Sequence, residues 1–266
     1  MKYFSKPSFS QPIDESGRYQ PTQSNSGQAA LRGEPSYVWR AGQERRLALI
    51  RKAAGDAIHG VVLEDGCGVG EYLARLQPLA SQAVGLELEF DRAEVAHGKA
   101  DQLTCASAEA LPYPDKTFDL ILSHEVLEHV HDDHRAAAEM IRALKPAGRL
   151  ILFVPNRGYP FETHGIYWRG KYHFGNKLFV NYLPRKWRDA LAPHVRAYSA
   201  ADLERLFSSR EIKVIEKRIL FGAYDNLIQH LGLFGRLIRT VLQSLEKTPL
   251  KVLGLSHFWV LEKTAE

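Results

Sequence analysis

The chain has 266 residues, of which 45% are hydrophobic, and its formal net charge is +4 at pH 7. This length and apolar content are enough to bury a sizeable core, and two cysteines exclude a disulfide framework. No apolar run is long enough to cross a bilayer, and residues 1–30 lack the apolar segment of a signal peptide, so we expect a cytoplasmic protein. The mild positive charge is typical of a solvated surface and argues against nucleic acid as a partner.

The N-terminal region differs in composition from the rest of the chain. Residues 1–33 are rich in Ser, Gln, Pro and Gly and have no apolar period, which predicts a flexible arm. We expect a single domain over residues 34–266. Near its start, Leu47, Ile50 and Ala54 share one face of a predicted helix, which we expect to pack beside a sheet.

The glycine loop at residues 66–70 is the strongest functional signal. Residues 61–63 (VVL) indicate a buried strand, residues 64–70 read EDGCGVG, and helical spacing then resumes. Glycine lets a ligand approach the backbone closely and tolerates positive φ angles. A dinucleotide-binding loop would have its last glycine where this chain has Glu71, and it would favour a phosphate. A carboxylate at Glu64 or Asp65 would instead suit the ammonium and sulfonium groups of S-adenosylmethionine.

Later segments fit a nucleoside site at the same edge of a sheet. Residues 83–87 (AVGLE) end in Glu87, and an acid at the tip of a second strand can accept hydrogen bonds from both ribose hydroxyls. A loop at 105–115 (CASAEALPYPD) precedes an apolar run at 118–123 (FDLILS), and residues 145–156 (KPAGRLILFVPN) form a turn and another buried strand. Strands that alternate with helices predict an α/β fold with a parallel sheet and a ligand at the carboxyl ends of its strands.

In this order, the motifs at 61–156 resemble those of class I S-adenosylmethionine-dependent methyltransferases, within the broad small-molecule group that includes the quinone-biosynthesis enzymes. The resemblance implies a doubly wound, mostly parallel seven-stranded sheet of Rossmann-like type. One departure is Ser107, because the family often has an acid there. The resemblance also implies the cofactor-binding residues, which are Glu64, Asp65, Gly66, Cys67, Gly68, Gly70, Glu87, Leu88, Ser107, Ala108, Glu109 and Ser123.

The segment after the fourth strand carries the candidate catalytic residues. Methyl transfer is an in-line displacement, so the enzyme must align the nucleophile, exclude water and often remove a proton. His124 lies just beyond the predicted strand tip. It acts either as a general base near neutral pH or only as a hydrogen-bonding partner of the cofactor or backbone. Glu125 and His129 are the other catalytic candidates.

Residues 125–129 (EVLEH) also resemble the E-x-x-E-H metal motif of small-RNA 2′-O-methyltransferases and of the ubiquinone-pathway O-methyltransferase. The resemblance implies that Glu125, Glu128, His129 and a later histidine, His164, bind a divalent metal, Mg²⁺ or Mn²⁺, and the oxygen and nitrogen ligands would also suit Zn²⁺. Because positions i and i+3 share a helical face, the two glutamates are predicted to point the same way. The alternative is a structural segment whose apolar residues pack inward while its polar residues cap or pair.

Two inserts interrupt the predicted fold, one after strand five and one between strands six and seven. Residues 157–197 interleave aromatic and basic side chains, and they form either the acceptor site or an aromatic mini-core with a solvated basic face. Strands are predicted at 211–218 and 256–263, after a helix that begins at the N-cap Ser199. Between them, residues 222–250 have apolar residues at helical spacing. This helical insert either packs on the domain or a second copy, or it contacts a membrane surface or lipid acceptor peripherally.

The sequence therefore predicts an S-adenosylmethionine-dependent methyltransferase that acts on an oxygen of a small molecule or of a glycan or lipid intermediate. Nitrogen and carbon acceptors are less favoured. One alternative is a metal-dependent RNA 2′-O-methyltransferase, which the aromatic and basic insert favours and the absence of an RNA-binding module disfavours. The other alternative is a cofactor-binding protein without catalysis.

Overall fold

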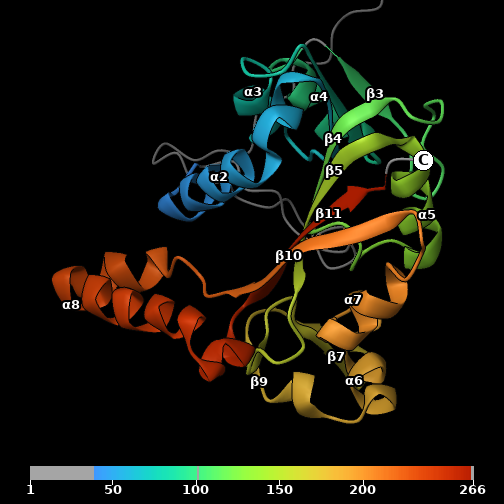
Figure 1. The fold of residues 1–266 in the computed structure, drawn as a ribbon. Helices are drawn as coiled ribbons and strands as arrows, with labels where there is room; N and C mark the ends of the chain where they lie inside the picture. Colours follow the sequence, from blue (N-terminus) through green and yellow to red (C-terminus); the bar gives the residue numbers. More distant parts are fainter. Residues whose placement is uncertain (1–38, 101, 265–266) are drawn as a thin grey trace, which may run out of the picture.

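A computed structural model describes residues 39–100 and 102–264. The predicted arm at 1–33 lies outside the described residues. The chain forms a seven-stranded sheet in the order β10-β11-β5-β4-β1-β2-β3 (Figure 1). All pairings between neighbouring strands are parallel except those of β11, which runs antiparallel to both β5 and β10. This confirms the predicted mostly parallel sheet. Its strands are β1 (Val61–Asp65), β2 (Gln82–Glu87), β3 (Leu103–Cys105), β4 (Phe118–His124), β5 (Leu144–Pro155), β10 (Ile212–Leu220) and β11 (Ser256–Lys263).

Helices cover both faces of the sheet (Figure 1). Successive strand residues point to opposite faces. Val62 therefore belongs to the buried cluster that α2 covers, and Leu63 belongs to the cluster that α5 covers. The predicted face of α2 is confirmed, because Leu47, Ile50 and Ala54 are all buried. The helices of the two layers are α2 (Ala41–Ala54), η1 (Gly55–His59), α3 (Leu73–Leu76), α4 (Phe90–His97), α5 (Asp133–Ala143) and α7 (Ala200–Leu206).

Two local predictions have different outcomes. Ser199 caps α7 as predicted, since its side chain accepts a hydrogen bond from the Asp202 amide in a capping box. In contrast, residues 125–131 form turns and bends, and no helix begins until Asp133. Glu125 has a φ of 59°, which breaks the helical path immediately after β4. The prediction that Glu125 and Glu128 share a helical face is therefore wrong.

The insert after β5 is built from short elements. Two antiparallel strand pairs, β6 with β9 and β7 with β8, precede a single turn and a short helix. The loop between β6 and β7 reaches a cavity, which its residues Thr163 and His164 line. The elements are β6 (Phe161–Glu162), β7 (Ile166–Trp168), β8 (Lys171–His173), β9 (Lys177–Leu178), η2 (Val180–Tyr182) and α6 (Arg185–Leu191).

The second insert separates β10 from β11, as predicted, and contains α8 (Asp225–Ser244), η3 (Leu245–Lys247) and η4 (Pro249–Leu253). Gly232 has φ 55° and ψ −123°, so α8 is kinked there. Figure 1 shows α8 beyond the helix layers of the sheet. Among the described residues of α8 only Gly235 is fully buried; Leu227, Ile228, Ile238 and Leu242 are half-buried, whereas several other apolar residues of the helix are exposed. Among the described residues, no helix combines the length and apolar character needed to cross a membrane.

Candidate active site

The glycine loop follows β1 and takes up a backbone path that glycine alone tolerates well. Gly66, Gly68 and Gly70 have φ angles of 72°, 55° and 77°. A Cβ atom on Gly66 would lie 2.3 Å from a methyl group of Val126. The loop thus presses against the turn after β4, and both the φ angle and the lack of space require glycine at position 66.

Glu87, at the end of β2, connects the second strand to this loop. Its Oε2 accepts a hydrogen bond from the Gly68 amide at 2.8 Å, and its Oε1 accepts one from the Glu89 amide at 2.9 Å. The side chain is 6% exposed and lines the cavity. The carboxylate is thereby fixed beside the loop at the strand tip, where the sequence predicts a ribose ligand.

The two acids that end β1 are buried. Glu64 is 3% exposed and Asp65 is 0% exposed. Ser123 Oγ donates to Asp65 Oδ2 at 3.2 Å, whereas Asp65 Oδ1 and Glu64 Oε2 accept no hydrogen bond from any described residue. Burial raises the pKa of Asp65 to about 7 and raises the pKa of Glu64 well above its ordinary value. Buried carboxylate oxygens without partners would be stabilised by a cation, so these residues fit the ammonium group of S-adenosylmethionine.

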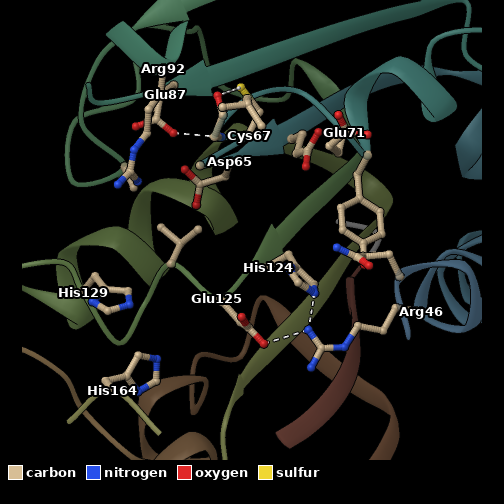
Figure 2. Close-up of a pocket in the computed structure, with 18 of the residues that line it drawn as sticks. Arg46, Asp65, Cys67, Glu71, Glu87, Arg92, His124, Glu125, His129 and His164 are labelled. Atoms are coloured by element: carbon tan, nitrogen blue, oxygen red, sulfur yellow. Dashed lines mark hydrogen bonds and ion pairs between the residues drawn. The ribbon is translucent and has the colours of Figure 1, made fainter. Parts of the chain in front are cut away.

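These residues surround one cavity of about 780 Å³ (Figure 2). All the predicted cofactor residues line it except Gly70 and Ser123. Ser123 lies behind Asp65, to which it donates its hydroxyl proton. Ser107 Oγ accepts from the Glu109 amide at 3.2 Å, and Glu109 Oε1 accepts from the His131 amide at 2.6 Å. The loop after β3 is therefore tied to the turn after β4.

Arg46 of α2 reaches into the cavity and contacts two predicted catalytic residues. Its Nη1 lies 2.6 Å from His124 Nε2 and 2.7 Å from Glu125 Oε1 (Figure 2). Burial and the neighbouring guanidinium lower the pKa of His124 to about 4. Because a guanidinium can only donate, Nε2 accepts and the proton of the neutral ring is on Nδ1. Burial would raise the pKa of Glu125, but the positive charge of Arg46 holds that pKa well below its ordinary value.

Three of the four predicted metal ligands lie together. Glu128, His129 and His164 each offer one ligand atom, and these atoms lie within 4.8 Å of one another. Figure 2 shows His129 and His164 near each other, whereas Glu125 points to Arg46. Glu128 is 1% exposed and neither carboxylate oxygen has a hydrogen-bond partner among the described residues. Burial and the nearby Glu125 raise its pKa.

The position of His164 is set by a buried ion pair that the sequence did not reveal. Glu162 Oε1 lies 3.0 Å from His164 Nδ1 and accepts from the His164 amide at 3.0 Å. Its Oε2 accepts from Arg188 Nη2 at 2.6 Å, and both side chains of this pair are at most 3% exposed. Burial would raise the pKa of Glu162, but His164 and Arg188 lower it to about 2. Glu162 is therefore ionised and orients His164 with Nε2 available, as carboxylates do for metal-binding histidines.

Sequence reasoning missed Arg46, Tyr72 and Glu162. Arg46 is next to the buried Leu47 in α2, and only the packing of that helix on the sheet carries it to His124. The Tyr72 ring contacts that of His124 at a centroid distance of 4.9 Å. Glu162 lies two residues before His164. Alternate residues of an extended segment face the same side, so this spacing could have indicated that the two side chains lie together.

Comparison with known proteins also indicates a methyltransferase. A family described as a methyltransferase domain matches residues 63–152. The uncharacterized methyltransferase YcgJ of Bacillus subtilis is 28% identical over 198 residues, which are 70% of this chain and 71% of that protein. A ubiquinone biosynthesis O-methyltransferase of Parvibaculum lavamentivorans is 31% identical over 133 residues, which are 48% of this chain and 50% of that protein.

Six further curated relatives match over a shorter part, and the chain spans 36 to 48% of their length. Among solved structures, an S-adenosylmethionine-dependent methyltransferase from Mesorhizobium loti has a TM-score of 0.58 at 18% identity, and the match covers 84% of this chain and 98% of that one. That likeness shows the fold. The matched domain, the ordered motifs and the glycine loop identify residues 63–152 as a class I S-adenosylmethionine-dependent methyltransferase domain.

Proposed function

We propose that the protein transfers a methyl group from S-adenosylmethionine to an oxygen of a small molecule or of a glycan or lipid intermediate, with a divalent cation beside the acceptor. One observation carries this proposal. The cavity that contains the buried acids after β1 also contains His129 and His164. A cofactor site and a candidate metal site therefore open into one space.

On the cofactor side, each residue has a physical task. Glu64 and Asp65 are buried, and a bound cation would favour their ionised forms, which would attract its ammonium group strongly. Glu87 presents a fixed carboxylate for two hydroxyl groups, and Leu88, Ser107 and Ala108 line the adjoining wall. The bound cofactor supplies the electrophilic methyl group, and the chain binds and orients it.

On the acceptor side, Glu128, His129 and His164 are the residues that would hold a divalent cation. The donor set of one carboxylate and two imidazoles fits Mn²⁺ or Zn²⁺, and the unpartnered oxygens of Glu128 are what such an ion would satisfy. The cation would supply Lewis acidity toward an acceptor hydroxyl. Glu125, engaged by Arg46, stands outside this set.

His124 is less suited to removing a proton than its place at the strand tip suggests. Its pKa is lowered to about 4, and Arg46 occupies the Nε2 lone pair that a base would use. Its ring also lies 4.9 Å from those of Tyr72 and Phe153. These contacts support a role for His124 in holding the cavity wall.

A small acceptor is favoured over RNA because several cations of the insert already interact with other groups of the protein. Arg188 is buried against Glu162, Arg185 pairs with Asp202, and Arg157 donates to the Leu183 carbonyl at 2.9 Å. Fewer of them are left to bind phosphates than their number in the sequence suggests.

The test is to incubate the protein with methyl-labelled S-adenosylmethionine and fractionated cell extract. We expect label in a small-molecule, glycan or lipid fraction. Label in RNA would support the 2′-O-methyltransferase alternative. Calorimetric binding of the cofactor without label in any fraction would support a non-catalytic protein.

The metal site has a separate readout. Titration with Mn²⁺, followed by calorimetry, should show binding that is lost in His164→Ala. The matched control is His173→Ala, which removes an exposed histidine of the same insert that does not line the cavity. Equal Mn²⁺ affinity in the two variants would rule out the metal site, whatever the activity.

A further inference from the structure

The insert between β10 and β11 exposes a group of large apolar side chains. We call residues 225–253, which contain α8, η3 and η4, the α8 extension. Leu233, Phe234 and Leu237 are 79%, 61% and 59% exposed, and Val241 is 54% exposed. These four residues lie within one sector of the helix after its kink. Contiguous exposed apolar groups of this kind mark interaction surfaces.

A second apolar group lies on the neighbouring insert, which hydrogen bonds join to the end of the α8 extension. Asn156 Nδ2 donates to the carbonyls of Val252 and Gly254, which fixes η4 against the start of that insert. Tyr182 in turn donates to the Gly158 carbonyl at 2.9 Å, and its ring stacks on that of Phe179.

In this second group, the aromatic ring of Phe179 is exposed to solvent. Phe179 is 56% exposed and has a φ of 62°, a left-handed conformation that a bulky residue rarely adopts. Its neighbour Leu178 is 53% exposed. We call residues 177–182 the insert edge. Residues held in such strained conformations cluster at functional and ligand-binding sites.

The charge of the α8 extension identifies its partner. It contains the cations Arg236, Arg239, Lys247 and Lys251, and its acids are Asp225 and Glu246. Glu246 is 7% exposed and pairs with Arg45 of α2 at 2.6 Å, so it contributes little negative charge to the surface. Two copies packed face to face would bring these cations together. An anionic lipid surface complements them, and the apolar residues beside them suit its acyl region.

The surface also borders the candidate active site. Leu220, Phe221 and Asp225, at the root of the α8 extension, line the cavity, and so do Tyr172 and Phe174 of the other insert. Phe174 is 73% exposed. A partner that covers the surface would therefore lie beside the cavity.

We propose that the α8 extension and the insert edge form a surface that binds anionic membranes peripherally, with Leu233, Phe234, Leu237 and Phe179 entering the interface. This interaction is independent of methyl transfer and holds whatever the acceptor is. The cations attract the protein to the lipid surface, and burial of the apolar side chains holds it there.

The test is co-sedimentation of the full chain with vesicles of phosphatidylcholine alone or mixed with phosphatidylglycerol. We expect binding to the mixed vesicles that weakens with salt and is at least about tenfold weaker to the neutral ones. Leu237→Glu should lower binding to the mixed vesicles by about tenfold or more. The matched control is Gln229→Glu, which makes the same charge change at an exposed polar residue of α8 before the kink and should lower it less.

Both variants change exposed residues, and unaltered unfolding temperatures and cofactor binding would show that each is folded. No binding to the mixed vesicles, or equal losses in the two variants, would overturn the proposal. So would a dimer in light scattering that Leu237→Glu dissociates, because a second copy would then cover the surface. A failure to find methyl transfer would leave the result unaffected.

Discussion

Asp65→Asn should stabilise the protein at alkaline pH and weaken cofactor binding. Asp65 is 0% exposed, and burial raises its pKa from an ordinary 3.8 to about 7. A carboxyl group whose pKa is raised by folding stabilises the native state below its unfolded pKa, and this contribution is lost as the pH rises through its folded pKa. The difference between the two pKa values corresponds to about 4 kcal/mol above pH 7. The neutral amide of Asn does not ionise, so the variant does not lose this stability above pH 7.

Denaturant unfolding at pH 5 and pH 8 measures this effect. Without cofactor, Asp65→Asn should gain up to about 4 kcal/mol over the natural protein at pH 8 and much less at pH 5. The matched control is Asp56→Asn, which neutralises an exposed acid and should change the free energy of unfolding by about 0.5 kcal/mol or less.

Cofactor titration completes the test. S-Adenosylmethionine affinity of the natural protein should rise as the pH passes through about 7, because Asp65 then becomes ionised. In Asp65→Asn this rise should disappear, and affinity at pH 8 should fall by about tenfold or more. A variant that loses stability at pH 8, or that keeps full affinity there, would refute the role of Asp65 as a buried counter-charge.

Three further changes probe the loop and the acceptor side. Gly66→Ala should cost about 2 kcal/mol or more in denaturant unfolding, because φ is 72° and the new Cβ would lie 2.3 Å from Val126; a neutral result would contradict the loop geometry. Glu87→Ala should lower cofactor affinity at least about tenfold in calorimetry, since the Gly68 amide also loses its acceptor; unchanged affinity would exclude the ribose role. Glu162→Gln should weaken Mn²⁺ binding by about 10- to 100-fold through the orientation of His164, and unaltered Mn²⁺ affinity would show that this carboxylate does not position the ligand.

The cofactor half of the site could be predicted because its signals are local. An apolar strand, the acids at its end and alternating glycines follow one another directly, and the fold brings their neighbours to one edge of the sheet. Most of the predicted cofactor residues accordingly line one cavity. Ser123, predicted as a cofactor residue, does not line the cavity and instead donates a hydrogen bond to Asp65.

The residues on the acceptor side of the cavity are brought together by tertiary contacts, which residue spacing does not predict. No Gly, Asn or Pro marks the left-handed turn at Glu125, so the helical periodicity was misleading there. Arg188 looks like a surface cation in the sequence but is buried against Glu162. Amphipathic spacing predicted the helix in residues 222–250, but periodicity alone does not say what covers its apolar face.

The most direct measurement is calorimetric titration of the protein with S-adenosylmethionine and, separately, with NAD. The buried acids beside the glycine loop should bind the cationic cofactor at one site per chain and discriminate against the pyrophosphate of NAD. Binding of S-adenosylmethionine that is lost in Glu87→Ala, with no binding of NAD, is the expected result. Binding of NAD without binding of S-adenosylmethionine would contradict the assignment of this cavity.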